Sequence, residues 1–233
     1  MTTRIDTQTT RMIYARVAGF TFLLYIALGI PAMILFNRAT DAQGIAAKLV
    51  GIAQHVSDVR LAAVLTLFSS FCALVLGVSL YVITRDEDPN LAMMALVFRV
   101  GEGVIGGISI QTSLGIVWLA TATGPNAPDT EVARSLGAFL LDGQGSGAAA
   151  LFFAVGSLLF SWLLLRGRMI PVALAWLGVL ASVLWVVGLP LQLVGVLPDS
   201  ATWFLYLPMA AFEIPLALWL LIKGVAMPIS EYK

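Results

Sequence analysis

Three ionisable residues lie within long apolar stretches of the sequence: Arg99, Glu102 and Glu213. A charge at the centre of a bilayer costs several kcal/mol unless it is paired or hydrated. Arg99 and Glu102 are three residues apart, so they share one face of a helix. A guanidinium group has a rigid fork of donors that can bind two carboxylates at once. We therefore expect a buried cluster in which Arg99 is flanked by Glu102 and Glu213.

Two interpretations of this cluster remain open. One arginine against two carboxylates leaves a net negative charge, so one glutamate would tend to hold a proton. In the first interpretation, the cluster lines a polar pocket for a proton, an ion or a small anionic ligand, and Pro215 frees the carbonyl of Ala211 as a nearby acceptor. In the second, the charges only hold two helices in register, since buried ion pairs often contribute specificity rather than stability.

A second and weaker polar group is predicted at the outer ends of the apolar stretches: His55, Asp58, Arg60, Asp142 and Gln144. One histidine with two carboxylates is a minimal set for metal binding or acid–base chemistry. Solvated charges at the ends of spanning helices explain the same residues without a site. Because the whole chain has one histidine and one cysteine, we expect no metal and no cofactor.

The elements that position these residues are predicted from composition. Of the 233 residues, 60% are apolar and 11% are charged, whereas a soluble domain has about 25% charged residues. A helix that spans a bilayer needs roughly 20 mostly apolar residues. Six runs satisfy this condition and predict an all-α, polytopic transmembrane bundle that forms a single membrane domain over residues 1–233. The predicted spans are 14–36, 61–84, 91–121, 143–165, 169–189 and 201–223.

The connections between the spans predict the topology. Residues 40–57 carry apolar side chains at helical spacing, which predicts an amphipathic helix on the outer surface or, alternatively, a loop packed on its neighbours. Residues 122–142 form a second outer loop with a turn-forming run at 124–129. Arginine and lysine are more frequent in the connections on the side of the N-terminus. This bias predicts that both termini are cytoplasmic.

Short motifs at the ends of the spans, and one within the span 91–121, are similar to those of one bacterial family. The motifs are Ala15-Arg16-Val17-Ala18-Gly19, Val56-Ser57-Asp58-Val59-Arg60, Pro89-Asn90-Leu91-Ala92, Leu96-Val97-Phe98-Arg99-Val100-Gly101-Glu102 and Leu165-Arg166-Gly167-Arg168-Met169-Ile170-Pro171. Together they resemble the uncharacterised bacterial integral-membrane family named domain of unknown function 4386. The resemblance implies a compact multi-pass bundle in the bacterial inner membrane and no established activity. The family often has a histidine near the position of 155–157, and this chain has none there.

Three classes of function are compatible with these features. We favour a small bundle that binds or transports a solute or a proton through Arg99, Glu102 and Glu213. The alternative is a membrane accessory, sensor or scaffold protein in which the buried charges are structural. A membrane enzyme fits least, because such enzymes usually gather several carboxylates or histidines.

The expected partners follow from the same composition. Membrane lipid surrounds the bundle, and a formal net charge of zero gives no reason to expect nucleic acid. The pairs Gly103–Gly107 and Gly143–Gly147 have the spacing that permits close approach of helices. They favour packing within the bundle or, as the alternative, an oligomer.

Overall fold

The computed structural model describes residues 2–144, 147–198 and 202–226. Within these ranges the chain forms helices and no strands. The helices are α1 (Thr2–Thr40), α2 (Ile45–Gln54), α3 (Val56–Thr84), α4 (Pro89–Thr121), α5 (Thr130–Gln144), α6 (Ala148–Arg166), α7 (Val172–Leu193) and α8 (Thr202–Ile222). Among them, 6 are long and apolar enough to cross a membrane: α1, α3, α4, α6, α7 and α8. The predicted all-α polytopic bundle with six spanning helices is therefore confirmed.

The helix bounds differ from the expected spans in places. Part of the outer loop expected at 122–142 is helical, because α5 begins at Thr130 directly after the predicted turn. The span expected to begin at residue 143 begins at Ala148 instead. Apolar residues at positions 132, 136 and 140 have helical spacing, but the polar residues between them keep the mean hydropathy of this segment low. The segment therefore has no continuous apolar run, and the sequence predicted a loop there.

Close contacts divide the chain into two compact units. Unit 1 comprises Met1–Tyr25, Phe71–Gly103 and Ala148–Lys233, and unit 2 comprises Ile26–Ser70 and Val104–Gly147. The helices α6, α7 and α8 belong to unit 1, whereas α2 and α5 belong to unit 2. The single membrane domain and the cytoplasmic termini stay predictions.

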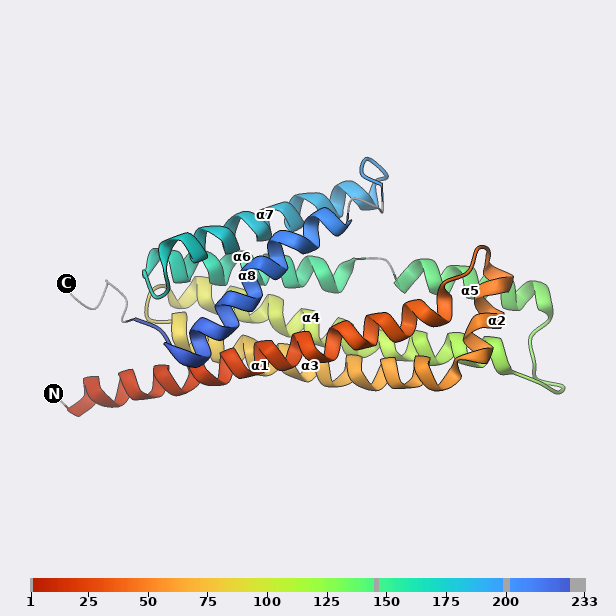
Figure 1. Ribbon diagram of the computed structural model, residues 1–233, viewed down its shortest axis with the longest axis horizontal. Coiled ribbons are helices and arrows are strands. Elements are labelled where there is room, and N and C mark those ends of the chain that lie inside the picture. Colours follow the sequence, from red (N-terminus) through yellow and green to blue (C-terminus); the bar gives the residue numbers. More distant parts are fainter. Residues whose placement is uncertain (1, 145–146, 199–201, 227–233) are drawn as a thin grey trace. The chain divides into compact units, whose positions relative to one another are not determined.

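The helices of unit 1 approach one another closely at glycine residues. Helices α6, α7 and α8 lie side by side (Figure 1). Gly178 of α7 faces the ring of Phe212 in α8 and the hydroxyl of Ser161 in α6. Gly19 of α1 lies against α8, where the backbone nitrogen of Leu221 is 2.5 Å from the position that a Cβ atom would occupy. Small residues permit this close packing in membranes, where helices are held together largely by van der Waals contact.

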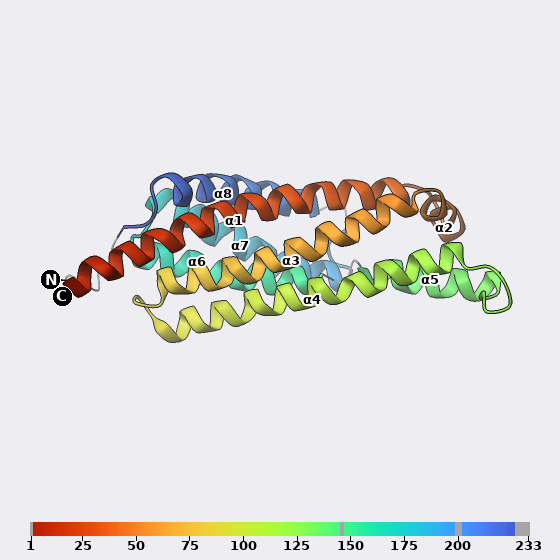
Figure 2. The same cartoon turned by 90° about the horizontal axis from the view of Figure 1, so that it is seen from below.

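A short connection joins the ends of α3 and α4 in unit 1, and the two helices turn back on each other there (Figure 2). Arg166 at the end of α6 pairs with two acidic residues of this connection. Its Nε atom is 3.0 Å from Oε1 of Glu87, and its Nη1 atom is 3.4 Å from Oδ2 of Asp88. The other oxygen of Asp88 accepts a 3.0 Å hydrogen bond from the backbone N–H of Leu91 in the first turn of α4. These bonds hold α3, α4 and α6 together at one end.

Unit 2 has its own apolar core beneath α2 and α5. Helix α2 packs against α5 (Figure 1), and Gly137 of α5 lies against the side chain of Leu49 in α2. The buried residues of the core are Ala39, Leu49, Ile52, Val59, Ile116, Val117 and Leu119. The helix expected within 40–57 is thus present as α2, and its location on the outer membrane surface stays a prediction.

Candidate functional site

Arg99 and Glu102 on α4 form a buried ion pair in unit 1. Nη1 of Arg99 lies 2.8 Å from Oε2 of Glu102, and the two residues are only 1% and 5% exposed. The other carboxylate oxygen, Oε1, accepts a 2.8 Å hydrogen bond from the hydroxyl of Tyr25 on α1. Tyr25 was not among the residues predicted for this site. The sequence does contain a signal for this residue, namely a tyrosine inside an apolar run. A buried tyrosine hydroxyl usually forms a hydrogen bond with a polar group.

The side chain of Arg99 is enclosed by four neighbours from other helices. A Cβ atom at Gly77 of α3 would lie 2.9 Å from Cβ of Arg99. A Cβ atom at Gly156 of α6 would lie 3.1 Å from both Cγ and Cδ of Arg99. The guanidinium carbon lies 5.1 Å from the ring centroid of Phe153 and 5.8 Å from that of Tyr25. Both distances are within the range of cation–π attraction. Two glycines thus make room for the stem, and two rings face the charge.

The hydrogen bonding of this cluster is incomplete among the described residues. The Nε and Nη2 atoms of Arg99 are buried and have no hydrogen-bond partner. Nη1 of Arg99 and Oε2 of Glu102 form an ion pair, but their geometry is not that of a hydrogen bond. A buried polar group without a partner costs about 1–3 kcal/mol. Such atoms therefore mark places where water, a proton or a ligand would bind favourably.

Glu213 on α8 is the third residue predicted for this site. It is 8% exposed, and its Oε1 atom is buried without a hydrogen-bond partner among the described residues. Glu213 interacts electrostatically with both Arg99 and Glu102. Within the described part of the chain, however, Arg99 forms an ion pair closer than 4.0 Å with Glu102 alone. The guanidinium fork thus contacts one carboxylate directly, and the second acts on it from farther away.

The second predicted polar group is engaged in local contacts of unit 2. His55 follows α2, and its Nδ1 atom lies 3.0 Å from the carbonyl oxygen of Gly51. Oδ2 of Asp58 is 4.0 Å from Nη1 of Arg38, and Arg60 is exposed. Across the described ranges, no group of three or more His, Cys, Asp or Glu side chains is placed to hold a metal ion. The side chains of the other two predicted members lie outside the described part: Asp142 and Gln144.

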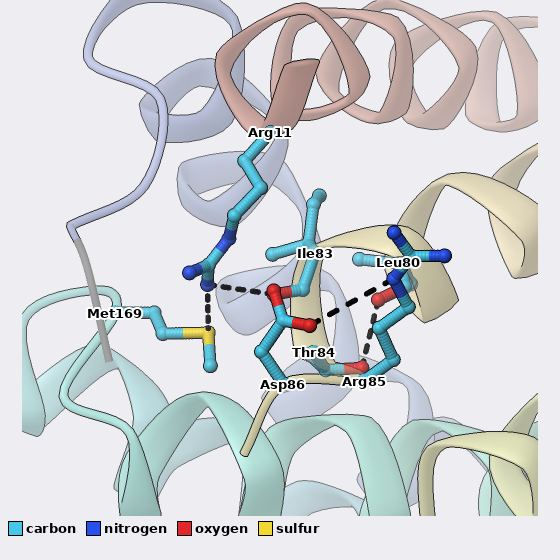
Figure 3. Close-up of polar contacts among 7 residues, drawn as sticks. All are labelled: Arg11, Leu80, Ile83, Thr84, Arg85, Asp86 and Met169. Atoms are coloured by element: carbon cyan, nitrogen blue, oxygen red, sulfur yellow. Dashed lines mark hydrogen bonds and ion pairs between the residues drawn. The ribbon is translucent and has the colours of Figure 1, made fainter. Parts of the chain in front are cut away.

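A further buried arginine, Arg11, lies on α1 in the basic segment that precedes the apolar run 14–36. It is 4% exposed. Its Nη2 atom donates a 2.7 Å hydrogen bond to the carbonyl oxygen of Ile83 and lies 3.4 Å from the sulfur of Met169 (Figure 3). The last carbonyls of a helix lack intrahelical donors and carry partial negative charge. Arg11 therefore joins α1 to the C-terminal end of α3 and to the segment that follows α6.

Six helices that can cross a bilayer, together with a charge cluster buried in unit 1, define an integral membrane protein of the multi-pass helical class. The chain belongs to the family described as domain of unknown function 4386, whose sequence model matches residues 17–224. This match confirms the resemblance drawn from the short motifs. No curated protein and no solved structure matches the chain.

Proposed function

We propose that this protein binds a small polar solute or a proton at the cluster of Arg99, Glu102 and Glu213 and carries it across the bacterial inner membrane. In this proposal both termini are cytoplasmic. The observation that supports it is the set of buried polar atoms without hydrogen-bond partners among the described residues, namely Nε and Nη2 of Arg99 and Oε1 of Glu213. An arginine that served only to pin helices together would be expected to have these donors satisfied by the protein.

The charges of the cluster indicate what it would take up. Two glutamates and one arginine leave an excess negative charge in a medium of low dielectric constant, which is costly. Tyr25 already donates to Glu102, so Glu213 is the carboxylate available for a proton or for a donor group of a solute. The two unused donor atoms of Arg99 suit an acceptor such as a carboxylate. A solute that carries both a donor and an acceptor would satisfy both residues.

The second candidate function is that of a membrane accessory, sensor or scaffold protein. The observation that favours it is the close fit of Arg99 between Gly77 and Gly156. In such a protein the buried charges would fix the register of α3, α4 and α6, and partner proteins would bind elsewhere.

The two candidates are distinguished by comparing wild type with Arg99→Ala and Glu213→Gln, each purified in mild detergent. Glu131→Gln, an exposed glutamate on α5, is the matched control. Thermal unfolding and native mass spectrometry would be followed across pH steps and a panel of inorganic ions, amino acids, carboxylic acids and lipids. The same proteins in vesicles that contain a pH-sensitive dye would report proton movement.

The proposed function predicts that a solute or a pH step raises the unfolding temperature of wild type and of the control. It also predicts that Glu213→Gln remains folded and loses this response, together with any proton movement in vesicles. The scaffold alternative predicts that Arg99→Ala is less stable and that no solute or pH step separates Glu213→Gln from wild type. That second result would overturn the proposed function.

A further inference from the structure

Ser182 on α7 carries a buried hydroxyl that the proposed function does not use. The residue is 0% exposed, and its Oγ atom forms no hydrogen bond with any residue that the structure describes. A serine inside a helix can bond to the carbonyl one turn earlier, as Ser79 does with Val75 at 2.8 Å. Ser182 has the same option at Gly178 and does not use it, so its hydroxyl is available to a ligand.

Ser182 lies on the face of α7 that packs against α6. Gly178, Ser182 and Trp185 are spaced at i, i+4 and i+7, so they form one row along the helix. At one end of the row, Gly178 faces the hydroxyl of Ser161. At the other end, the ring of Trp185 packs edge-on against Phe153, with 6.0 Å between the centroids. The residue numbers rise along α7 as they fall along α6, so the two helices are antiparallel and Ser182 is level with residue 157.

That level of α6 is in contact with Arg99. Ser157 occupies it and is 8% exposed. A Cβ atom at the adjacent Gly156 would lie 3.1 Å from Cγ of Arg99, and the guanidinium carbon is 5.1 Å from the ring centroid of Phe153. The hydroxyl on α7 is therefore at the level of the guanidinium nitrogens on α4 that also have no hydrogen-bond partner among the described residues.

Helix α8 brings Glu213 to the same region of unit 1, where α6, α7 and α8 lie side by side (Figure 1). The ring next to Glu213, that of Phe212, faces Gly178, and Trp185 donates a 2.7 Å hydrogen bond to the carbonyl of Leu205. These contacts make α7 and α8 antiparallel and leave Glu213 between one and two helix turns, of about 5.4 Å each, from the level of Ser182. Side chains tilt toward the N-terminus of their helix, so those of Ser182 and Glu213 tilt toward each other.

The polar atoms on α4, α7 and α8 match what a buried water molecule binds. Such a water makes about three hydrogen bonds, typically to polar groups that have no other partner. Nη2 of Arg99 can donate one, Oε1 of Glu213 can accept one, and the hydroxyl of Ser182 can do either. Water also suits the close packing around Arg99, whose side chain is enclosed by two glycines and two rings.

We propose that Ser182 extends the binding site to α7, where its hydroxyl holds a water molecule that delivers a proton to Glu213. The inference rests on the proposed function and selects the proton as the transported species. A water that has taken up a proton from the aqueous phase gives it to Oε1 of ionised Glu213, which leaves a neutral water and a neutral carboxylic acid. The cluster then holds one positive charge, Arg99, and one negative charge, Glu102, in place of the net negative charge that a medium of low dielectric constant disfavours.

The groups that act electrostatically on Glu213 come from two helices. They are Arg99 and Glu102 of α4 and Tyr25 of α1. Helix α7 contains no titratable residue, and α6 contains only Arg166 at its far end. The contribution of α7 to the site is therefore a hydroxyl without charge, which suits a residue that positions water.

The test compares wild type with Ser182→Ala, Ser182→Cys and Glu213→Gln in vesicles that contain a pH-sensitive dye. Ser79→Ala is the matched control, because it removes a buried hydroxyl that is bonded within its own helix. The rate of proton movement would be measured over a range of pH. Infrared difference spectra between high and low pH, recorded in ordinary water and in water labelled with heavy oxygen, would identify the stretching band of a bound water. Thermal unfolding would show that each variant is folded.

We expect wild type and Ser79→Ala to share an isotope-sensitive water band and the same pH profile of proton movement. Ser182→Ala should lose the band and move protons several-fold more slowly. Ser182→Cys should behave in the same way, because a thiol of similar size is a weak hydrogen-bonding group. Agreement between the two variants separates the loss of the hydroxyl from a change in packing and guards against the misfolding of one of them.

The failure of this inference is distinguishable from the failure of the proposed function. If Glu213→Gln stops proton movement while both Ser182 variants keep the water band and the rate of wild type, the role of Ser182 is overturned and the proposed function stands. If Glu213→Gln also matches wild type in every measurement, both are overturned.

Discussion

The hydroxyl of Tyr25 donates a 2.8 Å hydrogen bond to Oε1 of Glu102 and joins α1 to α4 within unit 1. Within the described part of the chain, Oε2 of the same carboxylate makes no hydrogen bond but forms an ion pair, 2.8 Å from Nη1 of Arg99. Oε1 of Glu213 is buried and has no hydrogen-bond partner among the described residues. Glu102 and Glu213 both lie within apolar runs of the sequence, but their surroundings in the folded chain differ. Glu102 is held in place, whereas Glu213 has an oxygen free to bind.

The bond between Tyr25 and Glu102 should contribute measurably to stability. We expect Tyr25→Phe to lower the free energy of unfolding by about 1–3 kcal/mol, because a buried carboxylate oxygen loses its donor. Equilibrium unfolding in mild detergent would measure the change. Tyr14→Phe, in the same helix, is the matched control and should stay within about 0.5 kcal/mol of wild type. An equal loss in both variants would show that the hydroxyl of Tyr25 has no special role.

The close fit around Arg99 predicts that an added methyl group at Gly156 is unfavourable. A Cβ atom there would lie 3.1 Å from Cγ and Cδ of Arg99, and overpacking of this kind costs about 1–3 kcal/mol. At Gly107 in α4 no atom lies within 4 Å of the Cβ position. Gly107→Ala should therefore be neutral or stabilising by up to about 1 kcal/mol, because alanine favours helix.

The origin of that cost can be tested with a double variant. If the methyl group added by Gly156→Ala clashes with the side chain of Arg99, the stability that this substitution costs should be smaller in an Arg99→Ala background. The effects of substitutions at two residues in contact are not additive. Thermal unfolding of the four proteins in this cycle would measure the coupling. Strict additivity would place the clash elsewhere, for example at the carbonyl of Ala95, which is 3.4 Å from the same position.

Arg11 should be more important for stability than its place in a basic N-terminal segment suggests. We expect Arg11→Met to lower the free energy of unfolding by about 1–3 kcal/mol, because the buried carbonyl of Ile83 loses a charged donor. Arg16→Met removes an exposed arginine from the same helix and should change stability by no more than about 0.5 kcal/mol. Chemical unfolding of both variants provides the comparison. Similar values for the two would mean that the contact in Figure 3 adds no stability.

The ion pairs at the connection between α3 and α4 should respond to salt. The side chain of Arg166 is 50% exposed, whereas that of its partner Glu87 is 6% exposed. Exposed pairs contribute up to about 1 kcal/mol, and salt screens them. We expect Arg166→Gln to reduce the unfolding temperature at low ionic strength, with a difference that narrows as sodium chloride is added. Arg168→Gln, nearby and exposed, should show no salt-dependent loss.

The sequence by itself determined the class of the protein and the number of spans. An apolar run long enough to cross a bilayer is a local property, so hydropathy along the chain is sufficient to find it. The shared face of Arg99 and Glu102 is also local, because it depends only on the period of a helix. Helix α5 was not predicted, because polar residues separate its apolar ones and no continuous apolar run results.

Only the tertiary structure decided which partner each buried charge has. Tyr25 and Glu102 are 77 positions apart, and Arg11 and Ile83 are 72 positions apart. A hydrogen bond requires its two atoms to lie about 3 Å apart. Whether residues on different helices reach that distance depends on the rotation and depth of each helix, which hydropathy leaves undefined. For this reason, the tie between Tyr25 and Glu102 and the unpartnered oxygen of Glu213 were visible only in the folded chain.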